Sequence, residues 1–283
     1  MQLSGMLALL LGSTAVSARA HRVEKHFIVD GRPVVTVSAL ARGRVEVKSW
    51  KNPEVVVIGN HSSEKLEIDT EQAQNRIEVT THVLDSSAQP AELEANFDIT
   101  VPEESELQVR TGSGTILVER VYGDMTFDTL TGDVHLKEVA GYIIIKTVGG
   151  SVLCVQCAGR LNISSISGNV DIREPLLNNL DVYTTSGNIY YDGQFLSHGT
   201  YKIRTGTGWV EVRFSDTDSF DLRVTTQRGR VDNQAEAYLK PDAHGFLHFP
   251  SNVVRGFFRS VNAGLARVEV SSFDGTIRLR KRD

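Results

Sequence analysis

The sequence lacks the short motifs that mark the common catalytic sites. It contains no Gly-x-Ser-x-Gly elbow, no His-Glu-x-x-His pair, no phosphate-binding loop and no dinucleotide fingerprint. Its eight histidines are scattered, and no two have the strong spacing of metal ligands. We therefore expect no catalytic residue, no cofactor and no metal site, and we expect the histidines to be solvated.

Long apolar runs are also missing, so no segment is expected to cross a membrane as a helix. One short apolar stretch, Met6 to Leu11, precedes Ala18-Arg19-Ala20, which has the small-x-small form of a signal-cleavage site. The residues before this stretch lack the usual Lys or Arg, and no cysteine lies near the site to carry a lipid anchor. Residues 1–20 are predicted to be a secretory signal, and the protein is expected to be exported, either periplasmic or at the cell surface.

Cysteine is scarce, and the only two, Cys154 and Cys157, have the Cys-x-x-Cys spacing. In the repeat described below, both occupy positions where neighbouring repeats carry aliphatic residues such as Val118 and Val121. Cysteine is often fully buried, so two core thiols are the favoured interpretation. A local disulfide remains open because export favours oxidation, and redox catalysis is the least favoured because no helix is expected to activate a thiol.

Excess positive charge is absent: the formal net charge of −5 argues against a nucleic-acid partner. The charge is nevertheless uneven. Residues 21–106 hold nine Lys or Arg against sixteen Asp or Glu, whereas residues 251–283 hold seven against three. The candidate basic end comprises Arg278, Arg280, Lys281 and Arg282. Head-to-tail self-association is one interpretation, and a solvated basic tail is the other.

A repeat is the main positive feature of the sequence. Gly114, Gly132, Gly150 and Gly168 recur at a constant step, and the same pattern, at somewhat less regular steps, surrounds Gly43, Gly187, Gly208, Gly229 and Gly275. Before and after each glycine, apolar and polar residues alternate, which indicates two short strands with one wet face. A fixed period of roughly this length is typical of a solenoid. We predict an all-β, right-handed parallel β-solenoid (β-helix-like) with coils of about 18–21 residues, in preference to an antiparallel sandwich.

A hydroxyl residue stands three positions before most of these glycines, as in Thr129 to Gly132. Glycine is expected to supply a positive φ at a tight corner. The hydroxyl column is expected to line that corner by bonding local backbone. An outward array facing ice or glycan is the alternative. The column comprises Thr111, Thr129, Thr147, Ser165, Thr184 and Thr205.

Residues 21–283 are predicted to form one solenoid domain with irregular excursions near 82–94 and 233–265. The second excursion carries Phe246, Phe249, Phe257 and Phe258 and is expected to cap the C-terminal end, since a bare strand edge promotes aggregation. Aromatic residues at polar positions of the repeat, Tyr183, Tyr190 and Trp209, are the candidate surface contact for a carbohydrate or another partner.

The stretch Leu107-Gln108-Val109-Arg110-Thr111-Gly112-Ser113-Gly114, with Thr131-Gly132-Asp133-Val134 after it, resembles the bacterial putative-adhesin family of β-strand-repeat proteins, also called toastrack domains. The resemblance covers roughly Pro33 to Arg280. It implies a β-helix-like domain in exported or envelope-associated proteins and brings no catalytic residues. Together these features predict a non-catalytic binding or scaffolding surface at the bacterial cell envelope, its glycan or protein partner not identified. The alternative is a polysaccharide-cleaving β-helix enzyme, but Asp124, Asp128 and Asp133 do not recur in the next repeat, where Tyr142, Lys146 and Ser151 stand.

Overall fold

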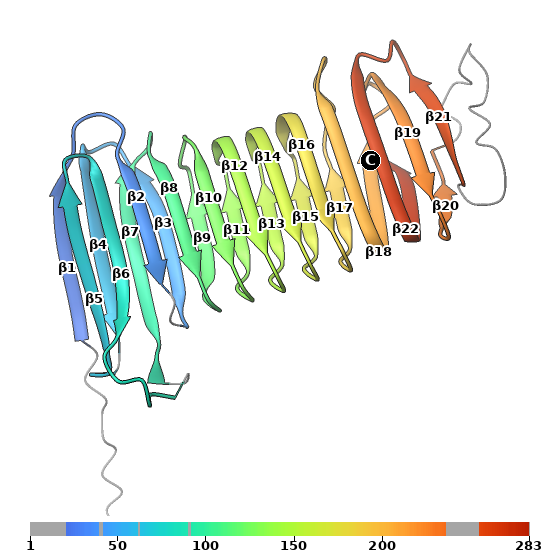
Figure 1. Ribbon diagram of the computed structural model, residues 1–283. Coiled ribbons are helices and arrows are strands. Elements are labelled where there is room, and N and C mark those ends of the chain that lie inside the picture. Colours follow the sequence, from blue (N-terminus) through green and yellow to red (C-terminus); the bar gives the residue numbers. More distant parts are fainter. Residues whose placement is uncertain (1–20, 40–41, 62, 90–91, 236–254, 283) are drawn as a thin grey trace, which may run out of the picture.

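The computed structural model describes residues 21–39, 42–61, 63–89, 92–235 and 255–282 (Figure 1). Within these residues the chain forms 22 β-strands and no α-helix. Accordingly, the described part contains no helix with the length and hydropathy of a membrane span.

The N-terminal strands are β1 (His21–Ile28), β2 (Val34–Ala39), β3 (Arg44–Trp50), β4 (Glu54–His61), β5 (Leu66–Ala73), β6 (Arg76–Val83) and β7 (Ala95–Pro102). The central strands are β8 (Glu106–Thr111), β9 (Thr115–Glu119), β10 (Met125–Thr129), β11 (Val134–Lys137), β12 (Ala140–Thr147), β13 (Val152–Val155), β14 (Ala158–Ser165), β15 (Val170–Arg173), β16 (Leu176–Thr184) and β17 (Ile189–Asp192). The C-terminal strands are β18 (Thr200–Phe214), β19 (Phe220–Thr226), β20 (Arg230–Asn233), β21 (Arg255–Val261) and β22 (Ala266–Lys281).

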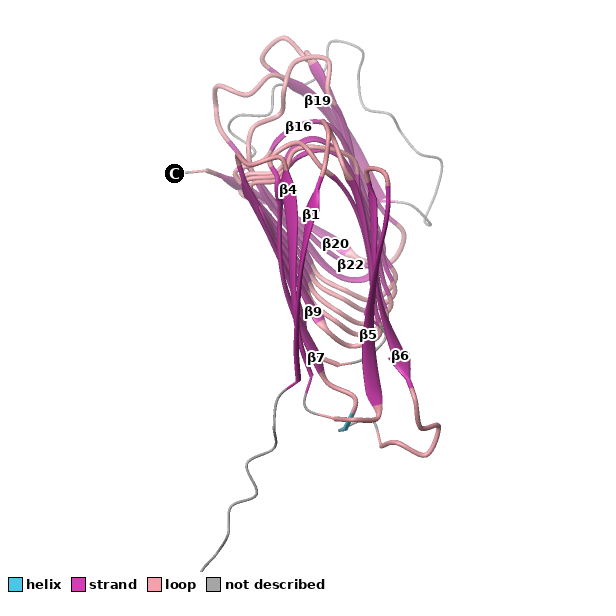
Figure 2. Cartoon of the chain, turned by 90° about the vertical axis from the view of Figure 1, so that its left-hand side faces the viewer, coloured by secondary structure: helices cyan, strands magenta, loops and turns pink. Residues whose placement is uncertain are grey.

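The strands form two facing walls of a flattened tube (Figure 2). Wall A contains, in spatial order, β5, β6, β2, β8, β10, β12, β14, β16, β18, β22, β19 and β21. Wall B contains β1, β4, β7, β3, β9, β11, β13, β15, β17, β18, β22 and β20. The long strands β18 and β22 pass through both walls. Pairing is parallel along the middle and antiparallel only near the ends.

The coils keep the register that the glycine period predicts. Thr129 pairs with Thr147 and Thr184 pairs with Thr205, so each hydroxyl lies beside the equivalent hydroxyl of the next repeat. Alternate side chains of each strand point into the tube, where most are under 3% exposed, and the intervening side chains face solvent. The predicted all-β solenoid is confirmed, with coils stacked side by side along one axis (Figure 1).

The order of coils at both ends differs from the order in the sequence. The first coil, β2 and β3, lies between β6/β7 and β8/β9. The last coil, β22, lies between β18 and the earlier strands β19 and β20. The C-terminal residues 278–282 are therefore one coil inside the end of the rod. The expectation that they form its basic end is wrong, because the insertion of β22 leaves β19 to β21 outermost.

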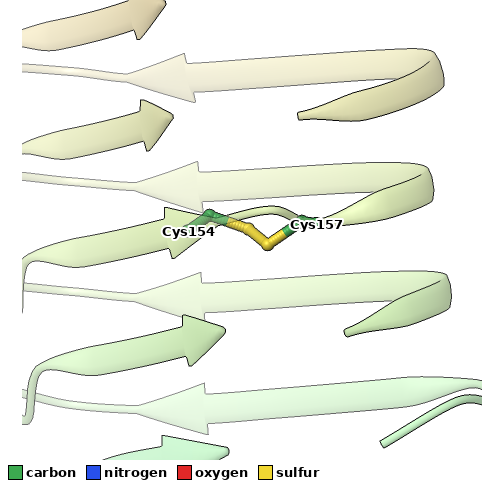
Figure 3. The surroundings of a disulfide bond; sticks show 2 residues. All are labelled: Cys154 and Cys157. Atoms are coloured by element: carbon green, nitrogen blue, oxygen red, sulfur yellow. A yellow bond between two sulfur atoms is a disulfide. The ribbon is translucent and has the colours of Figure 1, made fainter. Parts of the chain in front are cut away.

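The two cysteines lie at the corner where the chain leaves β13 on wall B for β14 on wall A (Figure 3). Both are fully buried, as the apolar columns predict. The favoured interpretation as two thiols is wrong, because Cys154 and Cys157 form a disulfide, with their Cα atoms 6.0 Å apart. Both side chains of a corner point into the same interior, so the positions that bury them also bring the sulfurs together.

The turn glycines are required for a reason other than the predicted positive φ. Among the glycines aligned by the repeat, only Gly43 and Gly208 have one, at 132° and 109°. At Gly150 a Cβ atom would overlap the carbonyl oxygen of Gly132, and at Gly168 it would overlap that of Gly150. Glycine is therefore selected mainly because the turns of successive coils stack closely, and less because the turn needs a positive φ.

The irregular segments lie near the ends of the rod. The segment between β6 and β7 contains no strand among its described residues. Most of the second predicted excursion, with Phe246 and Phe249, lies outside the described residues. Its last part forms β21, which pairs antiparallel with β19 and packs Phe257 against the core. At the other end, β1 and β5 are the outermost strands of the two walls.

Candidate binding groove

Two hollows lie along the edge of wall A, where each coil turns toward wall B, and we call the row of residues that runs through both of them the groove. Its floor is the column of buried hydroxyl residues that runs from Thr111 through Thr129 and Thr147. The residue before and the residue after each of these point outward on either side, because side chains alternate along a strand. The groove is thus built by the same three positions in every coil.

The inner bank of the groove consists of the residues that precede the floor column. The register places Arg110, Asp128, Lys146, Ser164, Tyr183, Arg204, Ser271 and Thr225 in this bank, in that order along the rod. Arg110 forms an ion pair with Asp128 at 3.5 Å, and Arg204 donates to Asp181 at 2.6 Å. Lys146 is exposed and makes no ion pair with any described residue. The bank is therefore basic in a protein whose net charge is −5.

The outer bank consists of the residues that follow the floor column, and four of them are large apolar side chains. Leu130, Val148, Ile166 and Phe273 are 57%, 40%, 54% and 46% exposed. Exposed apolar side chains that recur in register along one edge are unusual on a soluble surface and mark interaction sites. The two banks differ in character, since one is polar and carries several cations and the other carries four exposed apolar side chains.

Two hollows are formed along this groove. The larger, about 510 Å³, lies between Tyr183 and Phe273 over the small residues Gly206 and Ser271, with Arg223 at its side. The smaller, about 380 Å³, lies between Lys146 and Leu130.

The rings at the larger hollow are both stacked with arginines. The Arg204 guanidinium lies 5.7 Å from the Tyr183 ring centre, and that of Arg228 lies 5.3 Å from the centre of Phe273. Such stacking holds each ring at the rim of the hollow, while the rest of the ring surface remains exposed.

The hydroxyl floor serves the fold. Thr129, Thr147 and Ser165 are at most 6% exposed. Their hydroxyls accept hydrogen bonds from the backbone N–H of Gly132, Gly150 and Gly168 at 2.8–2.9 Å. The expected corner ladder is confirmed, and the alternative of an outward hydroxyl array is wrong.

The structure does not bring the three predicted aromatic residues together. Tyr183 is on wall A, in the groove, whereas Tyr190 and Trp209 lie on the outer surface of wall B. The Tyr190 ring lies between Arg173 and Arg213, at 5.9 and 5.5 Å, and burial followed by the nearby Asp192 raises its pKa. Trp209 is covered by Arg278 at 5.2 Å. Whether any of the three contacts a ligand stays a prediction.

The four predicted basic residues pair with acids of the same chain. Arg280 donates to Asp232 at 2.7 Å, and this hydrogen bond is the main cause that lowers the Asp232 pKa. Arg282 lies 3.1 Å from Asp192, Lys281 lies 3.1 Å from Asp216, and Arg278 lies 3.9 Å from Glu211. Head-to-tail association stays a prediction, but these residues do not supply a terminal basic face for it.

The acids considered for an enzyme lie at separate places. Asp124 is 3.9 Å from Arg32, Asp128 is in the groove, and Asp133 accepts from the Ser151 N–H at 2.8 Å. No group of three or more His, Cys, Asp or Glu in the described part of the chain could hold a metal ion.

Sequence reasoning missed most of the groove, including Phe273, Arg204 and Arg223. A signal for the outer bank was present, since Leu130, Val148, Ile166 and Phe273 each directly follow a hydroxyl of the turn motif. No sequence pattern indicated that Tyr183 and Phe273 lie at the same hollow, because this proximity depends on the insertion of β22 beside β18.

Of the similar solved structures, one supports the fold. The chain is similar to a putative adhesin from Bacteroides fragilis NCTC 9343, with a TM-score of 0.55 and 10% identity over 94% of this chain and 100% of that chain. A putative cell adhesion protein from Clostridium sporogenes ATCC 15579 shows 12% identity over 93% and 100% of the two chains, at a TM-score of 0.25. A putative adhesin from Parabacteroides merdae ATCC 43184 shows 8% identity over 91% and 95%, at a TM-score of 0.29.

A search of curated proteins gave no significant match. A family model does match, over residues 42–246, which include the central coils and most of both walls. The stacked coils, the buried hydroxyl turns and this match together place the chain in the Toastrack DUF4097 family.

Proposed function

We propose that this protein is a non-catalytic, exported binding domain of the bacterial cell envelope and that it contacts its partner through the wall A groove. The observation that carries the proposal is the open hollow between Tyr183 and Phe273, where two large rings remain 41% and 46% exposed above a floor of small residues. Exposed aromatic rings beside arginines are characteristic of contact surfaces.

The rigidity of the solenoid supports a binding role. The floor and inner-bank residues of the central coils stand on strands that are paired on both sides in parallel register, so the positions of successive contacts are fixed relative to one another. Repeated weak contacts on a stiff surface gain affinity through multivalency. The partner is an envelope glycan or protein.

Export has two further sources of support. A disulfide such as Cys154–Cys157 persists in oxidising compartments outside the cytoplasm. The similar structure from Bacteroides fragilis is named a putative adhesin, which agrees with an exported protein. The predicted signal, residues 1–20, lies outside the described residues.

The test is co-sedimentation of the purified protein with washed bacterial envelopes, with an assay for sugars released into the supernatant. Y183S/F273S should lower the bound fraction at least fivefold, because it removes both rings of the hollow. Y190S/W209S is the matched control on wall B and should bind as the wild type does.

Two results would contradict the proposal. Equal binding by Y183S/F273S and the wild type, with loss in Y190S/W209S, would move the contact to wall B. Release of sugars by the wild type would favour the polysaccharide-cleaving enzyme instead.

A further inference from the structure

The groove of wall A runs perpendicular to the strands and contains two separate hollows. Its outer bank runs through eight successive coils, from Gly112 to Gln227, by way of Ile166 and Phe273. At about 4.8 Å for each step between coils, the bank is about 34 Å long. A surface of this shape fits an extended polymer that lies along the axis of the rod.

From this geometry, and resting on the proposed function, we propose that the groove binds a linear acidic polysaccharide with its carboxylates on the inner bank and its ring faces toward the outer bank. The two banks match the two sides of such a polymer. Carboxylates pair with guanidinium and ammonium groups, and the apolar faces of sugar rings pack against Leu130, Val148 and Phe273.

The charges along the groove are sparse and mostly positive. Arg110, Lys146, Arg204 and Arg223 line the two hollows together with one carboxylate, Asp128. Two of these cations already have an acid beside them, since Arg110 pairs with Asp128 and Arg204 with Asp181. Arg110 and Lys146 are two coils apart, and Lys146 and Arg204 are three coils apart. These steps correspond to spacings of about 10 and 14 Å. Double-stranded DNA carries one charge per about 1.7 Å, much closer together than the cations of the groove, so its charge density fits this groove poorly. A polyuronate carries one carboxylate per sugar and is less densely charged.

An extended peptide fits less well. The central strands that cross beneath the groove use their backbone N–H and C=O groups in ladders to both neighbouring coils. A peptide could not add to the sheet by main-chain pairing there, so its backbone would gain no hydrogen bonds from the strands. A polysaccharide needs no main-chain pairing, since side chains recognise its groups one by one.

The experiment measures binding of the full-chain protein, as processed by the cell that expresses it, to immobilised polygalacturonate. The first control polymer is the same polymer with its carboxylates methyl-esterified. We expect saturable binding to the acid form, weakened several-fold by raising the salt from about 50 to 500 mM, and no binding to the ester. Galacturonate oligomers shorter than the groove should bind progressively more weakly.

Two double variants test the location. K146Q/R223Q should weaken the affinity about tenfold, because it removes one cation from each of the two hollows. K48Q/K137Q removes two cations from the outer surface of wall B, where both side chains are more than half exposed, and should leave the affinity unchanged. Unchanged thermal unfolding of both variants shows that only binding has been altered.

Each contrary result has a distinct meaning. Tighter binding of polyglutamate or single-stranded DNA than of polygalacturonate would overturn the polysaccharide inference, as would equal binding of the esterified polymer. If no polymer binds while the protein still sediments with envelopes through Tyr183 and Phe273, the inference fails and the proposed function stands. If sedimentation fails as well, both fail.

Discussion

At the scale of single residues, each turn depends on a glycine and on the hydroxyl three positions before it. The hydroxyl of Thr147 accepts a hydrogen bond from the Gly150 N–H at 2.9 Å inside the protein. The glycine lets the turn approach the carbonyl oxygen of the preceding coil. The first role shapes the turn within one coil and the second lets successive coils stack, so the motif recurs with the period of the coil.

Substitution of Gly150 by alanine should destabilise the fold by about 2–4 kcal/mol, because the new Cβ overlaps the Gly132 carbonyl oxygen and the backbone must shift. Gly149 is the matched control. A Cβ there has no neighbour closer than 3.7 Å, so Gly149→Ala should change stability by less than about 1 kcal/mol. Urea unfolding of the two variants measures the difference. Similar losses in both would show that close stacking is not what selects glycine.

The hydroxyl column gives a second prediction. Thr147→Val keeps the shape but leaves the buried Gly150 N–H without its acceptor, which should cost about 1–3 kcal/mol. Thr147→Ser should retain most of the stability, because Ser165 makes the same bond to Gly168 in the next coil. Chemical unfolding is again the measurement. A valine variant as stable as the serine variant would refute the role of the hydroxyl.

At the scale of elements, β1 is the outermost strand of wall B and pairs antiparallel with β4. Its exposed His26 lies 2.8 Å from Glu54 on β4 and 3.4 Å from Glu24. The hydrogen bond with Glu54, followed by that with Glu24, raises the pKa of His26 above its usual value. The ion pair therefore forms only while the imidazole is protonated, which makes the pairing of β1 dependent on pH.

The sign of this dependence follows from the raised pKa of His26. The contribution to stability is complete below the unfolded pKa of about 6.5 and is lost as the pH rises through the higher folded pKa. Hydrogen-exchange protection factors of the β1 amides should accordingly fall as the pH rises above about 6.5 and through the raised pKa of His26. In the H26Q variant the protection factors should not change over this range. A wild-type profile as flat as that of H26Q would contradict the prediction.

The disulfide corner between β13 and β14 belongs to the same scale. The bond closes a loop of only a few residues, so its loss should lower stability by about 2 kcal/mol. The suitable variant is C154V/C157V, since valine occupies the aligned positions Val118, two coils away from Cys154, and Val139, one coil away from Cys157. Unfolding with and without a reductant should show a loss in the wild type and none in the variant. Equal stability of the oxidised and reduced wild type would refute this estimate.

At the scale of the whole molecule, neither the first nor the last coil is outermost, because β5 and β6 lie outside β2, and β19 and β21 lie outside β22. The C-terminal strand β22 pairs with β18 on one side and with β19 and β20 on the other. The outermost coil at that end therefore cannot stack on the rod until the end of the chain has been placed between them.

A chain truncated after Ala235 tests this arrangement. Without β22, the strands β19 and β20 lose their parallel partner, and their amides should lose protection from hydrogen exchange while the coils up to β17 keep theirs. Deletion of β1, an edge strand with one partner, is the control and should leave protection elsewhere intact. Retained protection in β19 and β20 would show that they stack directly on β18.

Much of the central fold could be predicted from the sequence, because each coil repeats the same local rule. The constant step between glycines, the alternation around Phe127 or Ile145 and the buried hydroxyl turns follow from contacts between equivalent positions. The site was less predictable. Tyr183 was identified, but its neighbours Arg204 and Phe273 belong to later coils, and Phe273 meets it only through the placement of β22.

By itself, the sequence determined the coil: its length, its two strands and the residues that face inward. These features depend on a period that local alternation and stacking glycines impose on the chain. Only the tertiary structure decided which coils are neighbours at the ends, that the cysteines are bonded, and that Phe273 faces Tyr183 across a groove. The physical reason is that every coil offers similar edges for pairing, so the periodic pattern fixes what a coil is but leaves the order of the end coils to long-range packing.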